Sequence, residues 1–527
     1  MEIFGDITMK QLPGKAIIIL LVIIGFNILF GIDGVALLDP DEPVYAETAK
    51  EMIRFNEYLS PRIYNEYWYD KPPIFYWLLV GSLKLFGGFS ELAARLPASL
   101  MAIGAVLLTT FSAARQFNAR AGFWSGLVMG TTVMIMYMGK ASVTDTTLLF
   151  FMTGALLCFM HSKYWLMYLF CGFAVMTKGP IGVVFPGAIV FLYLLVTRDL
   201  GRLLRMHVIP GLLLVAAVGM PWYVFMYQNH GMDFIYEFIG FHNISRFAAP
   251  LHPNRVHWWF YLPVIILGLF PWTGVLLKSI KDAFTKSLGR ESARLLFLQV
   301  WWIFVLVFFS IAKTKQVSYM LVLLPALSMI IGWNIERMTC DNGKLQSGWV
   351  FGTFIMYLLM GAGWIVGGRQ LPEVATYGMA LGAVTLVLGV LILLALKKYC
   401  NVETAAWLHV VTGLVTMVMA FGVMMPQLQD RFSVKTIAKT YVAAEKDASR
   451  VLYIDKFLRP GFMLYTDIPG IEADTNSEKS LDAVKQDNRP KYIVMREFMY
   501  NKMKDKMGGE EWELLENKAG ICIYRSR

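Results

Sequence analysis

The chain has 527 residues, of which 57% are hydrophobic and only 16% are charged, and its mean hydropathy is +0.52. Soluble domains carry about 25% charged residues, so this composition excludes an ordinary soluble protein. The net charge of +10 does not indicate a nucleic-acid partner, because the basic residues stand in short clusters between apolar runs and form no basic face. Apolar runs of about 18 residues recur along the chain, which predicts a mainly α-helical, polytopic membrane protein.

The N-terminal segment predicts an uncleaved first helix. Lys10 and Lys15 precede an apolar run over 16–30, and no small-residue cleavage pattern follows it. Short loops rich in Lys and Arg mark the cytoplasmic side, which places the N-terminus in the cytoplasm and predicts about thirteen spans. The spans are expected near 15–33, 92–114, 120–138, 146–161, 164–176, 181–197, 207–227, 258–278, 295–311, 317–334, 347–367, 377–396 and 405–425.

Four lysines break this charge pattern, because the threading puts them on the outer side. They are Lys140, Lys178, Lys313 and Lys315. Each could be a helix-end lysine that reaches toward lipid headgroups. As a group, and on the same side as a set of carboxylates, they favour a binding site for an anion.

The first outer loop, 33–91, carries those carboxylates. Asp41 and Glu42 stand directly before an amphipathic stretch, "PVYAETAKEMIRFN", which is too short to span a membrane and predicts a helix at the interface. Asp41 could simply favour the N-terminus of that helix. Lys71, in "YDKPP", precedes a second short apolar helix, so the sequence predicts that two surface helices hold Asp41 and Lys71 at the outer mouth.

The chain changes character after Pro426. We expect a transmembrane part, 1–426, with outer loops at 33–91 and 228–257, followed by a soluble domain of α/β type, or alternatively α+β type, at 427–527 outside the cytoplasm. Its strand-like runs are "RVLYID", "KYIVM" and "GICIYR". The five cysteines show neither a pair outside the cytoplasm nor metal-ligand spacing, so no disulfide framework is expected.

A series of short motifs over roughly 15–335 resembles one known family. In chain order they are "PDEPVYAE" (40–47), "DKPP" (70–73), "ARLPASL" (94–100), "ASVTDTTLLFF" (141–151), "TKGP" (177–180), "PWY" (221–223), "FHNISRF" (241–247), "FPWT" (270–273) and "KTKQVSYMLVLLPAL" (313–327). The chain is similar to the GT-C-type glycosyltransferases that use lipid-phosphate sugars, in particular the 4-amino-4-deoxy-L-arabinose lipid A transferases and their protein O-mannosyltransferase relatives. Val44 departs from the pattern, since the arabinose transferases look like "DETRYAE" here.

The resemblance implies a polyprenyl-phosphate sugar as donor and a role for each motif residue. Asp41 would be the base or the group that orients the acceptor, with Asp145 as a second carboxylate, although Asp145 could also be an N-cap. Arg246 could bind phosphate with its fork of donors or meet lipid headgroups as an interfacial arginine. The expected phosphate-binding residues are Lys71, Arg246, Lys178, Lys313 and Lys315; the expected substrate-binding residues are Glu42, Tyr45, Tyr69, His242, Asn243, His252 and Tyr319.

The implied chemistry is a single attack on the anomeric carbon, with inversion and no covalent sugar–enzyme intermediate. "DPD" at 39–41 has the spacing of a metal-binding DxD site. Because lysines can neutralise the single phosphate of such a donor, we expect no cofactor and no required metal.

The expected protein is therefore a multi-pass glycosyltransferase of the bacterial inner membrane, with its site and C-terminal domain facing the periplasm. The best acceptor is lipid A, and a protein hydroxyl or another envelope glycan is the alternative. A transporter or lipid-linked sugar flippase is the rival class. The sequence shows no internal repeat, and its charges gather at one face, which disfavours a transporter.

Overall fold

The computed structural model describes residues 11–245, 257–287, 292–340, 347–444, 450–507 and 512–526. The chain divides into two compact units. The first comprises Met1–Phe30, Tyr69–Phe75 and Leu96–Gly422, and the second comprises Gly31–Trp68, Tyr76–Arg95 and Val423–Arg527. The division falls inside three helices. Most of the expected first outer loop, 33–91, groups with the C-terminal domain, whereas its segment Tyr69–Phe75 groups with the membrane helices.

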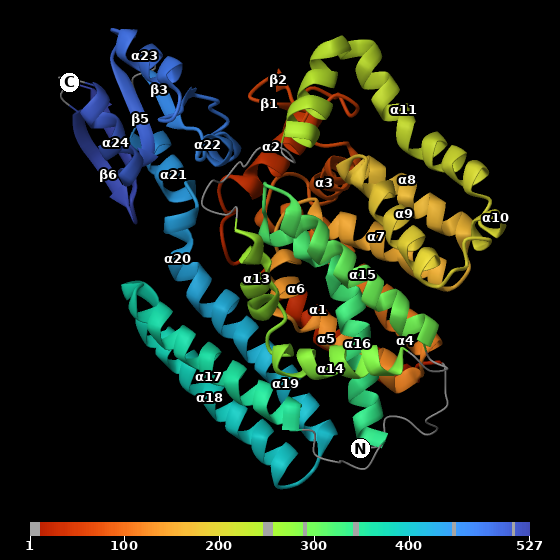
Figure 1. Cartoon of the computed structure of the whole chain (residues 1–527). Helices are drawn as coiled ribbons and strands as arrows, with labels where there is room; N and C mark the ends of the chain where they lie inside the picture. The colour runs from red at the N-terminus through yellow and green to blue at the C-terminus, as the bar shows by residue number, and fades with distance from the viewer. Residues whose placement is uncertain are drawn as a thin grey trace. The chain divides into compact units, whose positions relative to one another are not determined.

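Helices build almost all of the first unit (Figure 1). Seven helices of the described chain are long and apolar enough to cross a membrane, or eight if one bent pair counts as a span, and four shorter apolar helices accompany them. The chain is a multi-pass membrane protein, as its composition predicts. The helices are α1 (Gly14–Leu29), α4 (Glu91–Gln116), α5 (Ala119–Gly130), α6 (Val133–Met138), α7 (Asp145–Met160), α8 (Tyr164–Lys178), α9 (Ile181–Val196), α10 (Arg202–Arg205), α11 (Val208–Phe234), η1 (Ile235–Ser245), η3 (Trp258–Phe260), α13 (Tyr261–Gly268), α14 (Thr273–Lys286), α15 (Ser292–Ile311), η4 (Val317–Leu323), α16 (Leu324–Cys340), α17 (Ser347–Arg369), η5 (Pro372–Val374), α18 (Ala375–Lys397), α19 (Val402–Met417) and η6 (Val418–Met424).

Two expected spans are interrupted. The span expected at 258–278 is a bent pair, in which Trp258–Gly268 and Thr273–Lys286 meet at 110°. Pro271 lies at the bend, where its missing N–H favours a break in the helix. The span expected at 120–138 divides into α5 and α6, and the side chain of Thr132 caps the N-terminus of α6. Both breaks stop a continuous apolar run from forming one straight helix.

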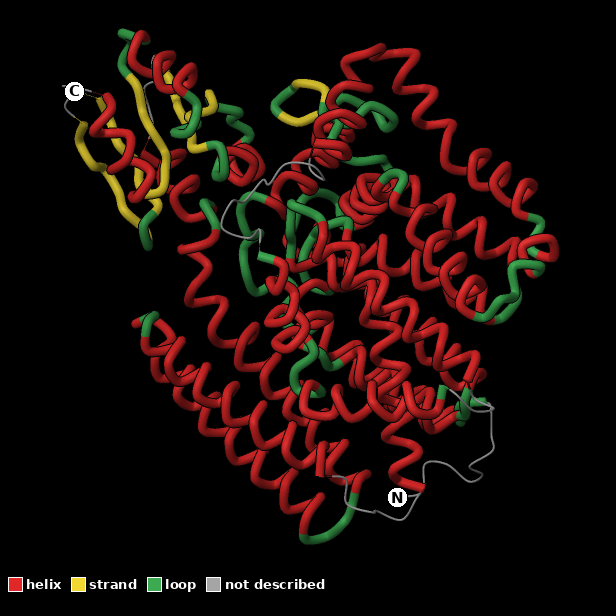
Figure 2. The backbone as a smooth tube through the Cα atoms, viewed as in Figure 1, coloured by secondary structure: helices red, strands yellow, loops and turns green. Residues whose placement is uncertain are grey.

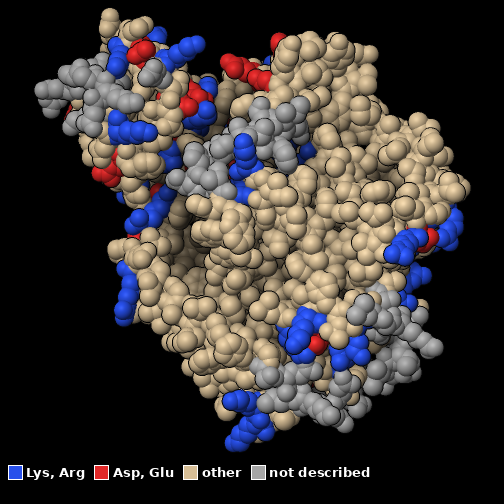
Figure 3. All heavy atoms as spheres, in the orientation of Figure 1, with Lys and Arg blue, Asp and Glu red and all other residues tan. Residues whose placement is uncertain are grey.

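The outer faces of the membrane helices are apolar. In α17 and α18, which lie side by side in Figure 1, large aliphatic side chains such as Leu359, Val366 and Val387 are more than half exposed. Figure 3 shows a mostly uncharged surface on the face in view, with Lys, Arg, Asp and Glu gathered in a few groups. Such faces suit lipid, where a helix satisfies its backbone hydrogen bonds internally.

The second unit contains a five-stranded sheet with the order β4-β3-β5-β7-β6 (Figure 2). β3 is parallel to β4 and β5, whereas β7 is antiparallel to β5 and β6. The expected strands at "RVLYID", "KYIVM" and "GICIYR" are confirmed as β3, β5 and β7. The elements of this unit are α2 (Asp41–Arg54), β1 (Arg62–Ile63), β2 (Glu66–Tyr67), most of α3 (Ile74–Leu85), α20 (Met425–Phe432), α21 (Lys435–Ala444), β3 (Val451–Asp455), α22 (Arg459–Thr466), β4 (Ile471–Ala473), α23 (Glu478–Gln486), β5 (Lys491–Arg496), α24 (Glu497–Met507), β6 (Trp512–Lys518) and β7 (Ile521–Ser526).

The sheet separates two hydrophobic clusters. Leu452 and Ile454 of β3 pack into one cluster with α21 and α22, whereas Tyr453 between them packs into the other with α23 and α24. Successive strand residues point to opposite faces, so both faces of this strand are covered. The result is an α/β domain, as the sequence predicts for this region.

α2 is buried more deeply than a helix lying on a membrane surface. Its length and position confirm the expected short helix, but Glu47 and Glu51 are only 1% and 0% exposed, which a helix lying at a membrane interface would not require. α22 packs against α2, and residues near the β1–β2 hairpin also contact it: the backbone N–H of Asn65 donates to the Glu51 carboxylate. Glu47 and Glu51 of α2 therefore lie at an internal contact surface.

Candidate active site

The first unit holds an ion pair between Asp145 and Lys178, 2.7 Å apart. A short turn joins α7 to α8, so the two helices run antiparallel and the last residue of α8 returns to the first residue of α7. A carboxylate at a helix N-terminus and an ammonium at a helix C-terminus both interact favourably with the helix dipole. Both side chains are mostly buried, at 14% and 16% exposed.

A second pair, Asp70 and Lys71, belongs to the same unit. The Lys71 ammonium lies 2.7 Å from an Asp70 carboxylate oxygen, and both side chains are about nine-tenths buried. The charge of Asp70 also acts on Lys178, whose ammonium lies 5.6 Å from the centroid of the Tyr319 ring. The structure thus brings together five residues from four separate motifs, namely Asp70, Lys71, Asp145, Lys178 and Tyr319.

The other three lysines that were predicted on the outer side, Lys140, Lys313 and Lys315, differ in their contacts. Lys315 is 1% exposed and donates to the carbonyl oxygens of Phe309 (3.2 Å), Ser310 (2.6 Å) and Ala312 (2.8 Å), at the C-terminal end of α15. An ammonium has three donors, so this lysine caps the helix, which differs from the predicted phosphate contact. Lys140 likewise donates to backbone carbonyls near the end of α1. Lys313 is exposed and has no hydrogen bond or ion pair with another described residue.

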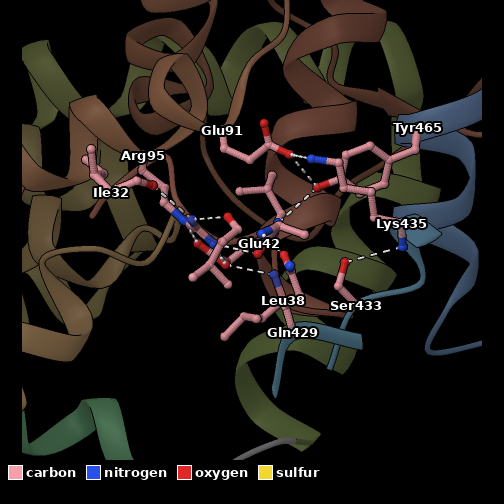
Figure 4. Close-up of polar contacts among 12 residues, drawn as sticks. Ile32, Leu38, Glu42, Glu91, Arg95, Gln429, Ser433, Lys435 and Tyr465 are labelled. Atoms are coloured by element: carbon pink, nitrogen blue, oxygen red, sulfur yellow. Dashed lines mark hydrogen bonds and ion pairs between the residues drawn. The ribbon is translucent and has the colours of Figure 1, made fainter. Parts of the chain in front are cut away.

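In the second unit, Asp41 and Glu42 face different environments. Asp41 is the first residue of α2 and is exposed, whereas Glu42 is only 3% exposed. The Glu42 carboxylate accepts from Arg95 Nε (2.9 Å) and Nη2 (2.7 Å) and from the backbone N–H of Leu38 (2.8 Å) (Figure 4). Glu42 therefore fixes the start of α2, which differs from its predicted contact with substrate.

Arg95, which the sequence analysis did not single out, organises the loop before Asp41. Its Nη1 donates to the carbonyls of Ile32 (2.9 Å) and Val35 (2.6 Å), and its Nη2 also donates to that of Ala36 (2.9 Å). With the two bonds to Glu42, all five N–H groups of the guanidinium are used. The available signal was an arginine in the apolar run "ELAARLPASL", where a buried charge needs a partner.

The C-terminal part of the chain holds the other side of the same loop. The backbone N–H of Ala36 donates to Gln429 Oε1 (3.1 Å), and that of Leu37 donates to the Tyr465 hydroxyl (2.9 Å). The backbone N–H of Asp39 donates to the Phe432 carbonyl (2.8 Å). Loop 31–40 is thereby fixed on both sides.

The Asp39 carboxylate is held by the C-terminal part of the chain. Its carboxylate accepts from the backbone N–H of Val434 (2.8 Å) and lies against Gly461, where a Cβ atom would approach Asp39 Oδ1 to 2.2 Å. Burial raises the pKa of Asp39 well above its usual range, against the opposing hydrogen bonds from Val434 and Gly461. Within the described residues, no group of three or more His, Cys, Asp or Glu side chains could hold a metal ion.

Two predicted aromatic residues lie in ring clusters. Tyr45 packs on Tyr76, with ring centroids 5.9 Å apart. Tyr69 lies 5.3 Å from the His230 ring and 5.8 Å from the Phe234 ring. The backbone of His242 and Asn243 belongs to η1, but their side chains, and Arg246 and His252 entirely, lie outside the described residues.

Several known proteins are similar in sequence to this chain. The family described as dolichyl-phosphate-mannose-protein mannosyltransferase matches residues 70–225. An uncharacterized protein of Aquifex aeolicus is 32% identical over 324 residues, which are 61% of this chain and 72% of that protein. The undecaprenyl phosphate-alpha-4-amino-4-deoxy-L-arabinose arabinosyl transferase of Aeromonas salmonicida is 27% identical over 314 residues, or 58% of this chain. The chain belongs to the GT-C glycosyltransferases of this arabinosyl transferase and mannosyltransferase type.

The fold agrees with that of a solved GT-C relative. ArnT from Cupriavidus metallidurans, in its crystal structure bound to undecaprenyl phosphate, superposes with a TM-score of 0.79 at 20% sequence identity, over 97% of both chains. The sequence match with the Aeromonas salmonicida enzyme spans 57% of that enzyme's length. The GT-C architecture predicted from the motifs is confirmed.

Proposed function

We propose that this GT-C protein is an inverting glycosyltransferase that moves a sugar from a polyprenyl phosphate to lipid A. The sugar it fits best is 4-amino-4-deoxy-L-arabinose. The observation that carries the proposal is the pair of lysine–carboxylate contacts, Lys71–Asp70 and Lys178–Asp145, in a chain whose relatives are named for transfer from undecaprenyl phosphate. The reaction would take place at the outer face of the bacterial inner membrane, where the tail of the donor stays in lipid.

Lys71 and Lys178 are assigned to the donor phosphate. Transfer leaves a negatively charged lipid phosphate behind, and ammonium groups held in place beforehand stabilise that charge without reorganisation. Asp70 and Asp145 hold these ammonium groups in position. Lys313, which is exposed, would add a positive charge that attracts the donor phosphate as it approaches these lysines. With these charges the chemistry would proceed without a divalent metal.

Asp41 is assigned to the acceptor. Unlike Asp39 and Glu42, it is exposed at the first turn of α2, and its position is set by the loop that Arg95 fixes. The carboxylate would attract and orient the incoming group, or remove its proton if that group is a hydroxyl. A lipid A phosphate is already ionised near neutral pH, so orientation would then be the larger contribution.

The test is sugar transfer by the purified protein in lipid nanodiscs, with polyprenyl-phosphate 4-amino-4-deoxy-L-arabinose as donor and lipid A as acceptor. Mass analysis should show a new glycosidic bond. Asp41→Asn should lower turnover by about 100-fold or more, because a positioned acid–base or orienting group contributes that much. Asp33→Asn, an exposed aspartate in the same loop, is the matched control. Full turnover in Asp41→Asn would remove Asp41 from the mechanism.

A protein hydroxyl is the second candidate acceptor, favoured by the match of residues 70–225 to the protein mannosyltransferase family. The same donor assay with envelope proteins in place of lipid A separates the two. Movement of the donor across sealed vesicles without a new bond would instead indicate a flippase.

A further inference from the structure

The loop that leads to Asp41 depends on partners from the C-terminal part of the chain. The backbone N–H groups of Ala36 and Leu37 are buried, and each donates to a side chain there, Gln429 and Tyr465 respectively. A buried backbone donor without a partner is unfavourable, so these two contacts constrain where the loop can lie.

The Tyr465 hydroxyl links α22 by hydrogen bonds to loop 31–40 and to α4. It accepts from Leu37, and it donates to Glu91 Oε1 at 3.2 Å (Figure 4). Glu91 is the first residue of α4, one turn before Arg95, and it also accepts from Lys435 at 2.5 Å. Burial raises the pKa of Tyr465, so the hydroxyl keeps the proton that it donates.

Apolar packing ties the same segments together. Leu37 of the loop, Ala46 of α2, Ala94 of α4 and Leu464 of α22 form one buried cluster. Phe89 and Tyr465 meet beside it edge to face, with ring centroids 5.7 Å apart. A shift of Tyr465 would therefore be transmitted to the start of α2, where Asp41 lies.

We infer that Tyr465 and Gln429 are positioning residues for Asp41, so that the C-terminal domain is part of the catalytic apparatus. The inference rests on the proposed function, because it takes Asp41 as the group that orients the acceptor. A catalytic group displaced by about 1 Å can lose as much as 100-fold in rate. Loss of one hydrogen bond of the loop should act on turnover more than on donor binding.

The decisive comparison uses two tyrosines of the same domain. Tyr465→Phe removes the hydroxyl that bonds Leu37 and Glu91, and Tyr453→Phe removes one that donates to Asp487 at 2.9 Å. We expect Tyr465→Phe to lower kcat about tenfold with the donor KM within about twofold, while Tyr453→Phe keeps both. Melting temperatures of both variants, measured in detergent, show whether either effect comes from unfolding.

A second pair lies on α20. Gln429→Leu removes the acceptor of the Ala36 N–H, and Gln427→Leu changes an exposed glutamine two residues away. Gln429→Leu should reduce kcat and Gln427→Leu should not. This comparison tests whether the C-terminal part positions Asp41 even if Tyr465→Phe fails to fold.

The outcomes separate this inference from the proposed function. The inference would be overturned if kcat were equal in Gln429→Leu and Gln427→Leu, and also equal in the two tyrosine variants where they fold. The proposed function would still be supported by the activity of the wild type and its loss in Asp41→Asn. An effect on KM alone would also overturn it. Absence of transfer by the wild type would overturn both.

Discussion

The Arg95 guanidinium donates two parallel hydrogen bonds to the Glu42 carboxylate, from Nε to Oε1 at 2.9 Å and from Nη2 to Oε2 at 2.7 Å. Both side chains are almost fully buried, at 6% and 5% exposed. Bidentate contact of this kind fixes direction as well as distance. The pair sets the orientation of the first turn of α2, one residue from Asp41.

Replacement of Arg95 by lysine should therefore be damaging even though the charge is kept. A lysine offers three donors from one point, so the Glu42 carboxylate and three loop carbonyls cannot all be satisfied. We expect a loss of about 2–4 kcal/mol in stability, seen as a lower melting temperature in detergent, and reduced turnover. Arg62→Lys, at the more exposed pair with Glu57, should lose less than about 1 kcal/mol. Equal losses in the two variants would contradict the positioning role of Arg95.

Alanine substitutions at Lys313 and Lys315, which are two residues apart, should have different effects on stability and on the donor KM. Lys315→Ala removes three hydrogen bonds to carbonyls at the end of α15 and should destabilise the protein by about 1–3 kcal/mol. Lys313→Ala removes an exposed charge and should leave the melting temperature unchanged while it raises the donor KM. The rise in KM should shrink in high salt. The reverse pattern would show that Lys315, not Lys313, meets the donor.

Glu47 should make stability depend on pH. Burial raises its pKa from 4.5 to about 7; Lys50 opposes the rise, whereas Glu51 and Asp467 add to it. Between pH 4.5 and 7 the unfolded chain has lost this proton while the folded chain retains it, so the free energy of unfolding falls as pH rises through that window. The loss amounts to at most about 3 kcal/mol above pH 7.

Glu47→Gln removes this titration. The variant should melt above the wild type at pH 8 and close to it at pH 4.5. Glu66→Gln, at an exposed position in β2, is the control and should shift the melting temperature little at either pH. A Glu47→Gln variant that is less stable than the wild type at pH 8 would show that the ion pair with Lys50 outweighs the burial of the charge.

Chelation should leave turnover unchanged. Lysine ammonium groups are assigned to the donor phosphate, and the Asp39 carboxylate accepts a hydrogen bond from the backbone N–H of Val434. Transfer measured after dialysis against EDTA, with and without added Mg²⁺ or Mn²⁺, checks this. A fall in kcat on chelation that one of these metals restores would contradict the proposed neutralisation by lysine.

The sequence was enough to predict the membrane class and the α/β character of the C-terminal domain. Both follow from local patterns: long apolar runs must form helices in lipid, and "RVLYID" and "KYIVM" have strand propensity. The motif residues Lys71, Asp145 and Lys178 also fall into one charge cluster, although their catalytic roles remain predictions.

Local sequence patterns could not predict the long-range polar contacts. The capping role of Lys315 depends on how the chain turns back after α15, and the burial of Glu47 depends on α22, which lies some four hundred residues further along. Helical periodicity could not reveal this contact, because it compares only residues of one helix. In the bent pair α13–α14, by contrast, Pro271 offered a local signal of the break.

The long separation between the partners of loop 31–40 has a consequence for biosynthesis. Leu37 and Tyr465 are 428 positions apart, and Ala36 and Gln429 are 393 apart. On the ribosome the loop emerges early, but its hydrogen bonds cannot form until nearly the whole chain has been translated. A chain released before Tyr465 therefore ends with membrane helices in place and an unfinished loop.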